Sequence, residues 1–211
     1  EGEMFGLVGL NGIGKTTLIK IILNLLPAED GSINIFGKSH YDFEAKHSFA
    51  YLPEKFIPSP YLKGEEFLEL SIGYYRLKYD SNEAEKLCEE LGLEKTVLKK
   101  RIGNYSKGMG QKLALIATFL TQAPLLILDE PMSGLDPSAR IALKRKLLAY
   151  KEGGGSVFFS SHILSDVEEI CDKIGILSSG CLIFNGSSPA FIKKYKAKNL
   201  EEAFLKAIDV V

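Results

Sequence analysis

The sequence predicts an α/β fold in which helices cover a mostly parallel central sheet on both faces. Helical and strand-like segments alternate through most of the chain, which is the pattern that builds parallel strands. The apolar run at residues 125–128 is typical of a buried strand. Two short apolar runs flank Ser179 and Gly180 and predict a hairpin, so a small antiparallel part should accompany the parallel sheet.

Strands crowd the first fifty residues, with one helix among them. Three strands are predicted, at residues 4–8, 32–36 and 48–52. An apolar-rich helix is expected at residues 16–26, because Pro27 stops it. The chain therefore opens as strand, loop and helix.

The middle of the chain is expected to be helical. From residue 64 to about residue 100, apolar side chains recur at helical spacings among charged ones. An apolar helix follows Gly108, and residues 55–122 are interpreted as a helical subdomain within a single domain spanning residues 1–211. Further on, we expect a helix at residues 137–151, strands at 157–160, 174–177 and 182–184, and helices from about residue 189.

Composition and charge describe an ordinary globular protein. The 211 residues are 45% hydrophobic and 25% charged, enough for one substantial core. The net charge of −1 gives no basic field, so no nucleic acid partner is expected. The most apolar stretch, residues 113–128, is interrupted by polar side chains and falls short of the roughly 18 residues that a membrane span requires. The residues interpreted as structural are Cys88, Cys171, Cys181, His40 and His47.

A phosphate-binding loop is the first motif that carries chemistry. Residues 9–17 read Gly-Leu-Asn-Gly-Ile-Gly-Lys-Thr-Thr and lie between a predicted strand and a predicted helix. Backbone N–H groups of such a loop can surround a phosphate at the positive end of the helix dipole. Lys15 would reach the β- and γ-phosphates of a nucleotide, and the Thr16 hydroxyl would bind Mg²⁺. The other expected nucleotide-binding residues are Asn11, Gly12, Gly14 and Thr17.

Two acidic residues end the apolar strand at residues 125–128. The carboxyl end of a parallel strand lies at the edge of the sheet where the phosphate loop also begins. Asp129 is therefore expected to bind Mg²⁺. Glu130 is the natural group to polarise an attacking water, because phosphoryl transfer depends mainly on placing the nucleophile in line.

A third motif resembles that of a known family. Residues 105–109, Tyr-Ser-Lys-Gly-Met, resemble the Leu-Ser-Gly-Gly-Gln signature of ATP-binding-cassette (ABC) ATPases. The motifs follow the family's order, because the signature and the acidic strand are followed by Ser-Gly-Leu-Asp at residues 133–136 and Ser-Ser-His at residues 160–162. The resemblance covers nearly the whole chain and implies the fold of an ABC-type phosphate-loop NTPase.

The resemblance also implies roles for particular residues. In the family, the signature of one subunit faces the ATP held by a second subunit, so Ser106 and Gly108 would contact a γ-phosphate across a head-to-tail dimer. Asp136 matches the loop that lies between the two ATP sites. His162 matches the histidine that touches the γ-phosphate and would act in catalysis with Glu130. Without the family, Ser106 is a helix N-cap, and both interpretations can hold together.

Two features depart from the family pattern. Glu54 stands where a glutamine usually contacts the Mg²⁺ site, and we expect its carboxylate to keep the metal and nucleotide contacts. Tyr105, Lys107 and Met109 give the signature a form that resembles ATPase subunits of bacterial ABC-2 exporters, which favours export over import. Family members also stack an aromatic residue on adenine from strands ahead of the first one seen here, so roughly 20 to 25 residues are expected to be missing before Glu1.

These observations predict an ATP-hydrolysing subunit of an ABC transporter that uses ATP and Mg²⁺. Its expected partners are an integral membrane permease subunit and a second ATP-binding subunit, which would hold the chain at the cytoplasmic side of the cell membrane. The alternative is a soluble ABC-family ATPase. A DNA-repair ATPase would need a long coiled coil between Lys15 and Ser106, and a translation or regulatory factor usually has two cassettes in one chain. A nucleotide sensor without catalysis would usually lack one of the catalytic residues.

Overall fold

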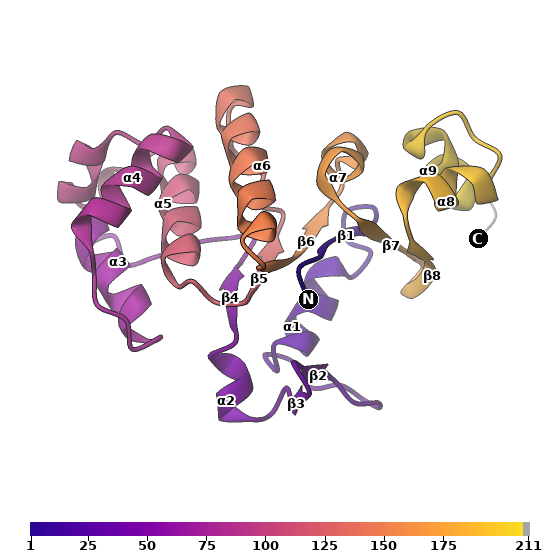
Figure 1. Cartoon of the computed structure of the whole chain (residues 1–211), viewed down its shortest axis with the longest axis horizontal. Coiled ribbons are helices and arrows are strands. Elements are labelled where there is room, and N and C mark those ends of the chain that lie inside the picture. The colour runs from indigo at the N-terminus through magenta and orange to yellow at the C-terminus, as the bar shows by residue number, and fades with distance from the viewer. Residues whose placement is uncertain (209–211) are drawn as a thin grey trace.

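The computed structural model describes residues 1–208 and has a central sheet of the predicted kind (Figure 1). Its strand order is β4-β5-β6-β1-β7-β8, and each neighbouring pair is parallel except β7 and β8, which form the predicted antiparallel hairpin. The strands are β1 (Met4–Val8), β4 (Phe49–Leu52), β5 (Leu125–Asp129), β6 (Ser156–Ser161), β7 (Lys173–Ser178) and β8 (Cys181–Gly186).

Helices cover both faces of the sheet. Figure 1 shows α1 on one face and α6 and α7 on the other. The α-helices are α1 (Lys15–Ile22), α2 (Phe43–Lys46), α3 (Gly64–Gly73), α4 (Ser81–Leu91), α5 (Lys107–Leu120), α6 (Pro137–Glu152), α7 (Leu164–Ile170), α8 (Ser188–Lys194) and α9 (Leu200–Ile208). Within the described residues, no helix is both long enough and apolar enough to cross a membrane.

Alternate side chains of the central strands supply two separate apolar layers. Leu126 and Leu128 of β5 belong to the larger cluster, which includes residues of α5, α6 and α7. Ile127 points the other way and packs with Ile19 and Leu23 from α1 and the residue after it. Each fully buried side chain of this size stabilises the fold by roughly 1.5–3 kcal/mol. Apolar packing therefore stabilises both faces of the sheet, and the loops that follow the carboxyl ends of the strands begin from a rigid structure.

The first helix is shorter than predicted. It ends at Ile22 instead of residue 26, because Asn24 takes a left-handed conformation with φ 55°. The Leu25 N–H donates to Lys20 O at 2.8 Å, and the Asn24 N–H donates to Ile21 O at 3.0 Å. This pattern closes a helix, and here it does so before Pro27.

The second predicted strand is also shorter. Residues 32–36 were expected to form it, but β2 (Asn34–Ile35) has only two residues and pairs with β3 (Lys38–Ser39). Phe36 and Gly37 both have positive φ and form a tight two-residue turn between the strands. The helices α2 and α7 were not predicted from the sequence.

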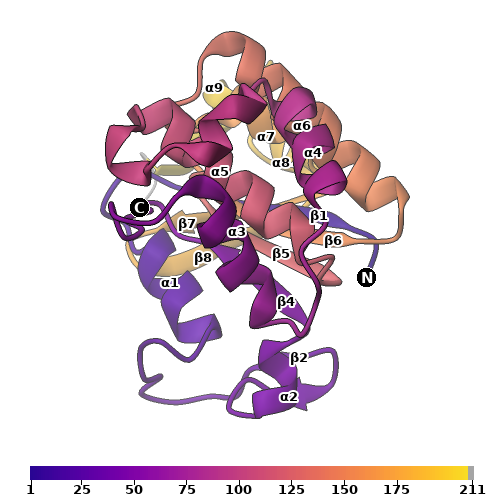
Figure 2. The ribbon, with the colours of Figure 1, turned by 90° about the vertical axis from the view of Figure 1, so that its left-hand side faces the viewer.

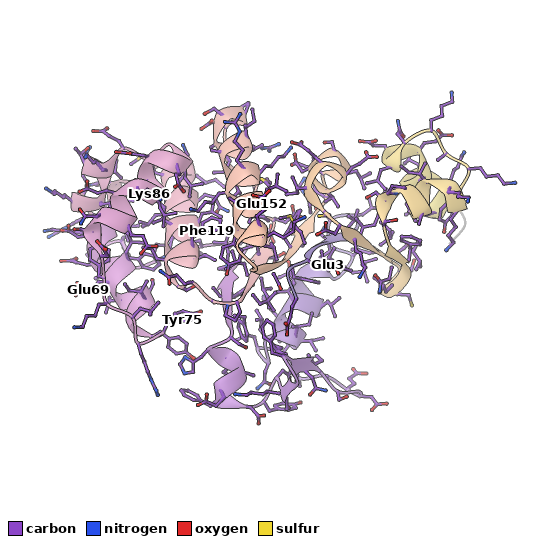
Figure 3. The ribbon with its side chains drawn as sticks, in the orientation of Figure 1. Glu3, Glu69, Tyr75, Lys86, Phe119 and Glu152 are labelled. Atoms are coloured by element: carbon purple, nitrogen blue, oxygen red, sulfur yellow. The ribbon has the colours of Figure 1, made fainter. Side chains whose placement is uncertain are left out.

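The middle of the chain is helical, as expected. Figure 2 looks onto α3, α4 and α5, which lie together beside one edge of the sheet. Two 3₁₀ segments, Lys95–Lys99 and Ile102–Asn104, connect α4 to α5. Tyr75, labelled in Figure 3, ties this helical group to the sheet because its hydroxyl donates to Phe49 O of β4 at 2.9 Å.

Candidate functional site

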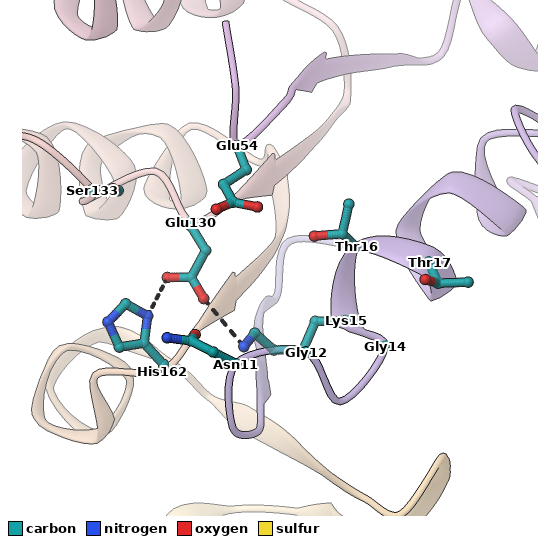
Figure 4. A pocket seen from close by; sticks show the side chains of 10 residues that line it. All are labelled: Asn11, Gly12, Gly14, Lys15, Thr16, Thr17, Glu54, Glu130, Ser133 and His162. Carbon is teal, nitrogen blue, oxygen red and sulfur yellow. Dashed lines mark hydrogen bonds and ion pairs between the residues drawn. The ribbon is translucent and has the colours of Figure 1, made fainter. Parts of the chain in front are cut away.

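A cleft of about 540 Å³ opens where four parallel strands end (Figure 4). The segments that follow β1, β4, β5 and β6 supply its lining, as is usual for ligand sites in parallel sheets. All of the lining residues except Ser133 were predicted as site residues from the sequence. They are Asn11, Gly12, Gly14, Lys15, Thr16, Thr17, Glu54, Glu130, Ser133 and His162.

Glycine determines the path of the loop at residues 9–17. A Cβ on Gly9 would lie 2.8 Å from Leu177 O and 2.8 Å from Ile13 Cγ2, so no side chain fits there. Gly14 has φ 109° and is the N-cap of α1, where it brings no side chain to accept from the first N–H groups. The first turn of α1 also contains no acidic residue. The N–H groups at the positive end of the helix dipole therefore remain available to an anion.

A chain of polar contacts crosses the cleft. Lys15 Nζ donates to Gly9 O at 2.8 Å and pairs with Glu130 Oε1 at 3.3 Å. Glu130 Oε2 lies 2.8 Å from His162 Nδ1 (Figure 4). The side chains of Lys15 and Glu130 are only 6% and 11% exposed, so their pairing is little screened by water. The three side chains are thus held together at the centre of the cleft.

Glu130 has an unusual backbone conformation that aims its side chain. Its φ is 50°, in the left-handed region that costs a non-glycine residue about 1–3 kcal/mol. The Glu130 N–H is held by a hydrogen bond to Ser160 Oγ at 3.0 Å. Because the chain turns sharply here, Glu130 points towards Lys15 and His162 while Asp129 remains inside the sheet.

Asp129 is fully buried, and only one of its two carboxylate oxygens has a hydrogen-bond partner. Its Oδ1 accepts a hydrogen bond from Ser160 Oγ at 2.5 Å, whereas its Oδ2 is buried without a hydrogen-bond partner. A buried carboxylate oxygen with no donor is costly unless a cation balances it. The described residues contain no group of three or more His, Cys, Asp or Glu side chains placed to hold a metal by themselves. Mg²⁺ fits this arrangement, since it usually binds one or two carboxylates together with waters and phosphates.

Oxygen atoms gather on one side of the cleft. Figure 4 shows the Thr16 hydroxyl and the Glu54 carboxylate facing the same space. Burial, together with the charges of Asp129 and Glu54, raises the pKa of Tyr51 to about 12. The Thr16 hydroxyl and the Glu54 carboxylate give this side of the cleft oxygen atoms of the kind that a hard cation binds.

The residues expected to act on a second subunit do not line this cleft. Ser106 is the N-cap of α5 and accepts from Met109 N at 3.2 Å, which confirms the N-cap interpretation. Asp136 is the N-cap of α6 and accepts from Ala139 N at 2.9 Å, and this bond lowers the pKa of Asp136. Gly108 packs against the loop before α6 and is also absent from the cleft lining.

A second hollow of about 430 Å³ adjoins the first. Ser106, Lys107 and Gln111 line it, and Glu54 and Ser133 line both hollows. The signature segment therefore lies beside the cleft in the same chain but outside it.

Three further residues organise the site but were given no role from the sequence, although Ser133 and Ser160 lie in the motifs at residues 133–136 and 160–162. Ser133 lies in both hollows, and the buried Gln111 amide donates to Pro131 O at 3.1 Å, which links α5 to the segment after β5. Ser160 binds both acidic residues and lies opposite Asp129 in the register of β5 and β6. The sequence holds a serine at that position, but its role depends on the register, which no local pattern reveals.

The family follows from the match to known proteins. The family model described as ABC transporter matches residues 1–133. The uncharacterised ABC transporter ATP-binding protein sll0415 of Synechocystis is 41% identical over 190 residues, which are 89% of this chain and 54% of that protein. The linearmycin resistance ATP-binding protein LnrL of Bacillus subtilis is 31% identical over 220 aligned positions, covering 99% of this chain and 70% of LnrL.

The fold is also that of a solved relative. The structure of an ATP-binding subunit of an ABC transporter matches with a TM-score of 0.89 at 35% identity, covering 97% of this chain and 88% of that one. The chain therefore belongs to the ABC transporter family and is an ATP-binding domain of the ABC ATPase class. It spans about half the length of sll0415.

Proposed function

We propose that this chain binds ATP in the cleft, hydrolyses it and drives transport through a membrane partner. The observation that carries the proposal is the linked set of Lys15, Glu130 and His162 beside a buried, half-satisfied Asp129. A cation for phosphates, a carboxylate for water and a carboxylate oxygen without a donor are the groups that phosphoryl transfer to water requires.

The phosphates of ATP would occupy the loop at residues 9–17. The open N–H groups at the start of α1 face the anion, and Lys15 supplies a full positive charge at its centre. Lys15 is already fixed by the carbonyl oxygens of Gly9 and Leu10, at 2.8 Å and 3.3 Å, so it loses little freedom when phosphate binds. Binding would draw Lys15 from Glu130 towards the phosphates and free a carboxylate oxygen for water.

Mg²⁺ would be held by the Thr16 hydroxyl, Asp129 and Glu54. Asp129 has the strongest case, because its Oδ2 is buried and has no hydrogen-bond partner. When bound, the metal neutralises charge on the phosphate oxygens and so stabilises the transition state. Glu54 is exposed at the rim, where its carboxylate can turn inward.

Hydrolysis requires an oriented water molecule and a proton acceptor. Glu130 would accept a hydrogen bond from the water that attacks the γ-phosphorus, while the bond from that phosphorus to the bridging oxygen breaks. The proton of the water passes to Glu130 and then to phosphate, and the products are ADP and inorganic phosphate. His162 holds Glu130 Oε2 at 2.8 Å and lies 44% exposed at the rim, so it can also reach the γ-phosphate.

Two chains would form a head-to-tail sandwich around two ATP molecules. Ser106, Gly108 and Asp136 lie outside the cleft of their own chain, which is expected if they serve the nucleotide of the partner chain. Ser106 offers a hydroxyl and the start of α5 offers N–H groups, the same chemistry that the phosphate loop uses. The composite site would therefore close only when both chains bind ATP.

The sandwich would work on an integral membrane permease subunit at the cytoplasmic face of the cell membrane. Residues 55–122, which contain α3, α4 and α5, would form the helical subdomain that passes the motion on. Export is favoured over import for two reasons. Residues 105–109 give the signature a form that resembles ATPase subunits of bacterial ABC-2 exporters, and the relative LnrL is a linearmycin resistance protein.

Replacing Glu130 by Gln tests this function directly. Glu130→Gln keeps the shape of the side chain but removes the proton acceptor, so hydrolysis should fall about 100-fold or more while ATP binding persists. The variant should also form an ATP-dependent dimer in size-exclusion chromatography. Glu152→Gln, an exposed change at the end of α6, is the control and should behave as the unchanged chain. Hydrolysis by Glu130→Gln at the rate of the control would refute the role of Glu130.

A further inference from the structure

Ser160 binds both acidic residues of the site from inside the sheet. It lies in β6 between β5 and β1, opposite Asp129 on one side and Leu7 on the other, and it is 0% exposed. Its Oγ is 2.5 Å from Asp129 Oδ1 and 3.0 Å from the Glu130 backbone nitrogen. One buried hydroxyl thus contacts the side chain of one acid and the main chain of the next.

The direction of these two hydrogen bonds is fixed by chemistry. A backbone N–H can only donate, so the Glu130 N–H donates to Ser160 Oγ. The one hydroxyl proton is then left for Asp129 Oδ1, which as a carboxylate oxygen can only accept. The Ser160 hydroxyl makes one donated and one accepted bond, and neither can be reversed.

This arrangement decides which oxygen of Asp129 is free. Because Oδ1 is held by a short charge-assisted bond, the carboxylate cannot turn about its bond to Cβ without losing that partner. Oδ2 is consequently the oxygen that stays buried and unpartnered. The same hydroxyl holds the Glu130 N–H at a residue whose φ of 50° would otherwise relax.

We propose that Ser160 is a positioning residue, which presents Asp129 Oδ2 to the nucleotide-bound metal and fixes the turn that aims Glu130. This inference rests on the proposed function. Partners that orient a metal ligand in this way typically contribute about 10- to 100-fold to metal affinity or activity. Ser160 does not line the cleft, so its effect would pass through the two acids.

Among the described residues, the buried hydroxyls of Thr118 and Thr121 bind only their own segments. Thr118 donates to Ala114 O, four residues before it in α5. Thr121 donates to Thr118 O at 2.7 Å and accepts from Ala123 N at 3.2 Å, so it makes the same two kinds of bond as Ser160 but only with its own segment. Thr121 is 7% exposed and does not line the cleft, which makes it a matched control.

The test compares Ser160→Ala, Ser160→Thr and Thr121→Ala. The binding measurement is titration of Mn²⁺, followed by its electron paramagnetic resonance signal, in the presence of a non-hydrolysable ATP analogue. We expect Ser160→Ala to weaken Mn²⁺ binding about 10-fold or more, with Thr121→Ala unchanged and Ser160→Thr largely restored because it keeps the hydroxyl. Melting temperatures identify any variant that is unfolded, and only folded variants are compared.

The possible results separate this inference from the proposed function. The positioning role is wrong if folded Ser160→Ala binds Mn²⁺ as tightly as Thr121→Ala. It is also wrong if folded Ser160→Thr, which keeps a hydroxyl, binds Mn²⁺ as weakly as Ser160→Ala. If the unchanged chain binds the Mn²⁺–nucleotide but does not hydrolyse ATP, the proposed function fails while the positioning role stands. The positioning role is supported if Mn²⁺ binding is lost in Ser160→Ala but kept in Ser160→Thr and Thr121→Ala.

Discussion

The nucleotide cleft and the starts of α5 and α6 are both polar, but their side chains are organised differently. In the cleft, Lys15, Glu130 and His162 contact one another in a continuous chain of polar groups. At the helix starts, Ser106 and Asp136 each accept a hydrogen bond from the first turn of their own helix, and neither reaches the cleft.

Under the proposed function, this difference explains how one chain can contribute to two nucleotide sites, its own cleft and that of a partner chain. The cleft groups pair with each other across three strands, so folding alone assembles them. The helix starts are stabilised locally, because each N-cap satisfies an N–H of its own helix and leaves the rest of the helix end to its surroundings. Under the proposed function, a second copy of the chain brings the ligand that this second region meets.

The largest effect should come from breaking the polar chain of the cleft. Lys15→Ala removes the only charged group of the loop at residues 9–17, so ATP affinity and hydrolysis should each fall about 100-fold or more. The measurements are equilibrium binding of a fluorescent ATP analogue and phosphate release. Lys20→Ala, in the last turn of the same helix, is the control. Equal ATP affinity in the two variants would contradict the assignment of the cleft.

A smaller effect should separate the two regions. Ser106→Ala and Ser187→Ala both remove an N-cap hydroxyl, from α5 and α8 respectively, and should each lower the free energy of unfolding by about 1 kcal/mol. Only Ser106→Ala should also reduce ATP hydrolysis, by about 10-fold, because its hydroxyl is lost from the composite site. Nucleotide binding by the separated chains should not change.

Urea unfolding and steady-state phosphate release measure the two quantities. Equal hydrolysis by the two N-cap variants would mean that Ser106 is a structural cap and nothing more.

The smallest effect should appear in the pH dependence of stability at the start of α6. The hydrogen bond from Ala139 N lowers the pKa of Asp136 below its ordinary value of 3.8, with a further contribution from Lys112. A lowered pKa means that the charged form stabilises the fold above about pH 4 and that this contribution is lost as pH falls through the folded-state pKa. Asp136→Asn should therefore be slightly less stable than the unchanged chain near pH 7, and the difference should shrink towards about pH 3.

Urea unfolding at several pH values measures this difference. Asp42→Asn is the control, because Asp42 precedes α2 without making a capping hydrogen bond through its side chain. A stability difference for Asp136→Asn that stays constant with pH would count against the charged cap.

Much of the fold and of the cleft could be predicted from the sequence. The apolar strand at β5, the hairpin of β7 and β8 and the helix α6 follow from periodicity and turn residues, which are local properties. The predicted cleft residues also came together, because consecutive parallel strands deliver their following residues to one edge of the sheet.

Local signals failed where a backbone conformation decided the outcome. Pro27 predicts that the first helix ends at residue 26, but Asn24 ends it earlier by adopting a left-handed conformation. The length of strand β2 was overestimated for a similar reason. Phe36 has a positive φ, which its residue type does not predict, and the strand ends before it. Both misses concern one or two torsion angles, which the surrounding structure selects.

By itself, the sequence determined the order of most of the strands and helices along the chain, α2 and α7 excepted, and the identities of most of the groups that meet at the cleft. Only the tertiary structure decided how those groups contact one another. Ser160 holds Asp129 Oδ1 because β5 and β6 pair in a register that places the two residues opposite each other, and Glu130 reaches Lys15 because its backbone turns left-handed. Register and strain depend on contacts between residues about 30 positions apart or more, so they arise only when the whole sheet has formed.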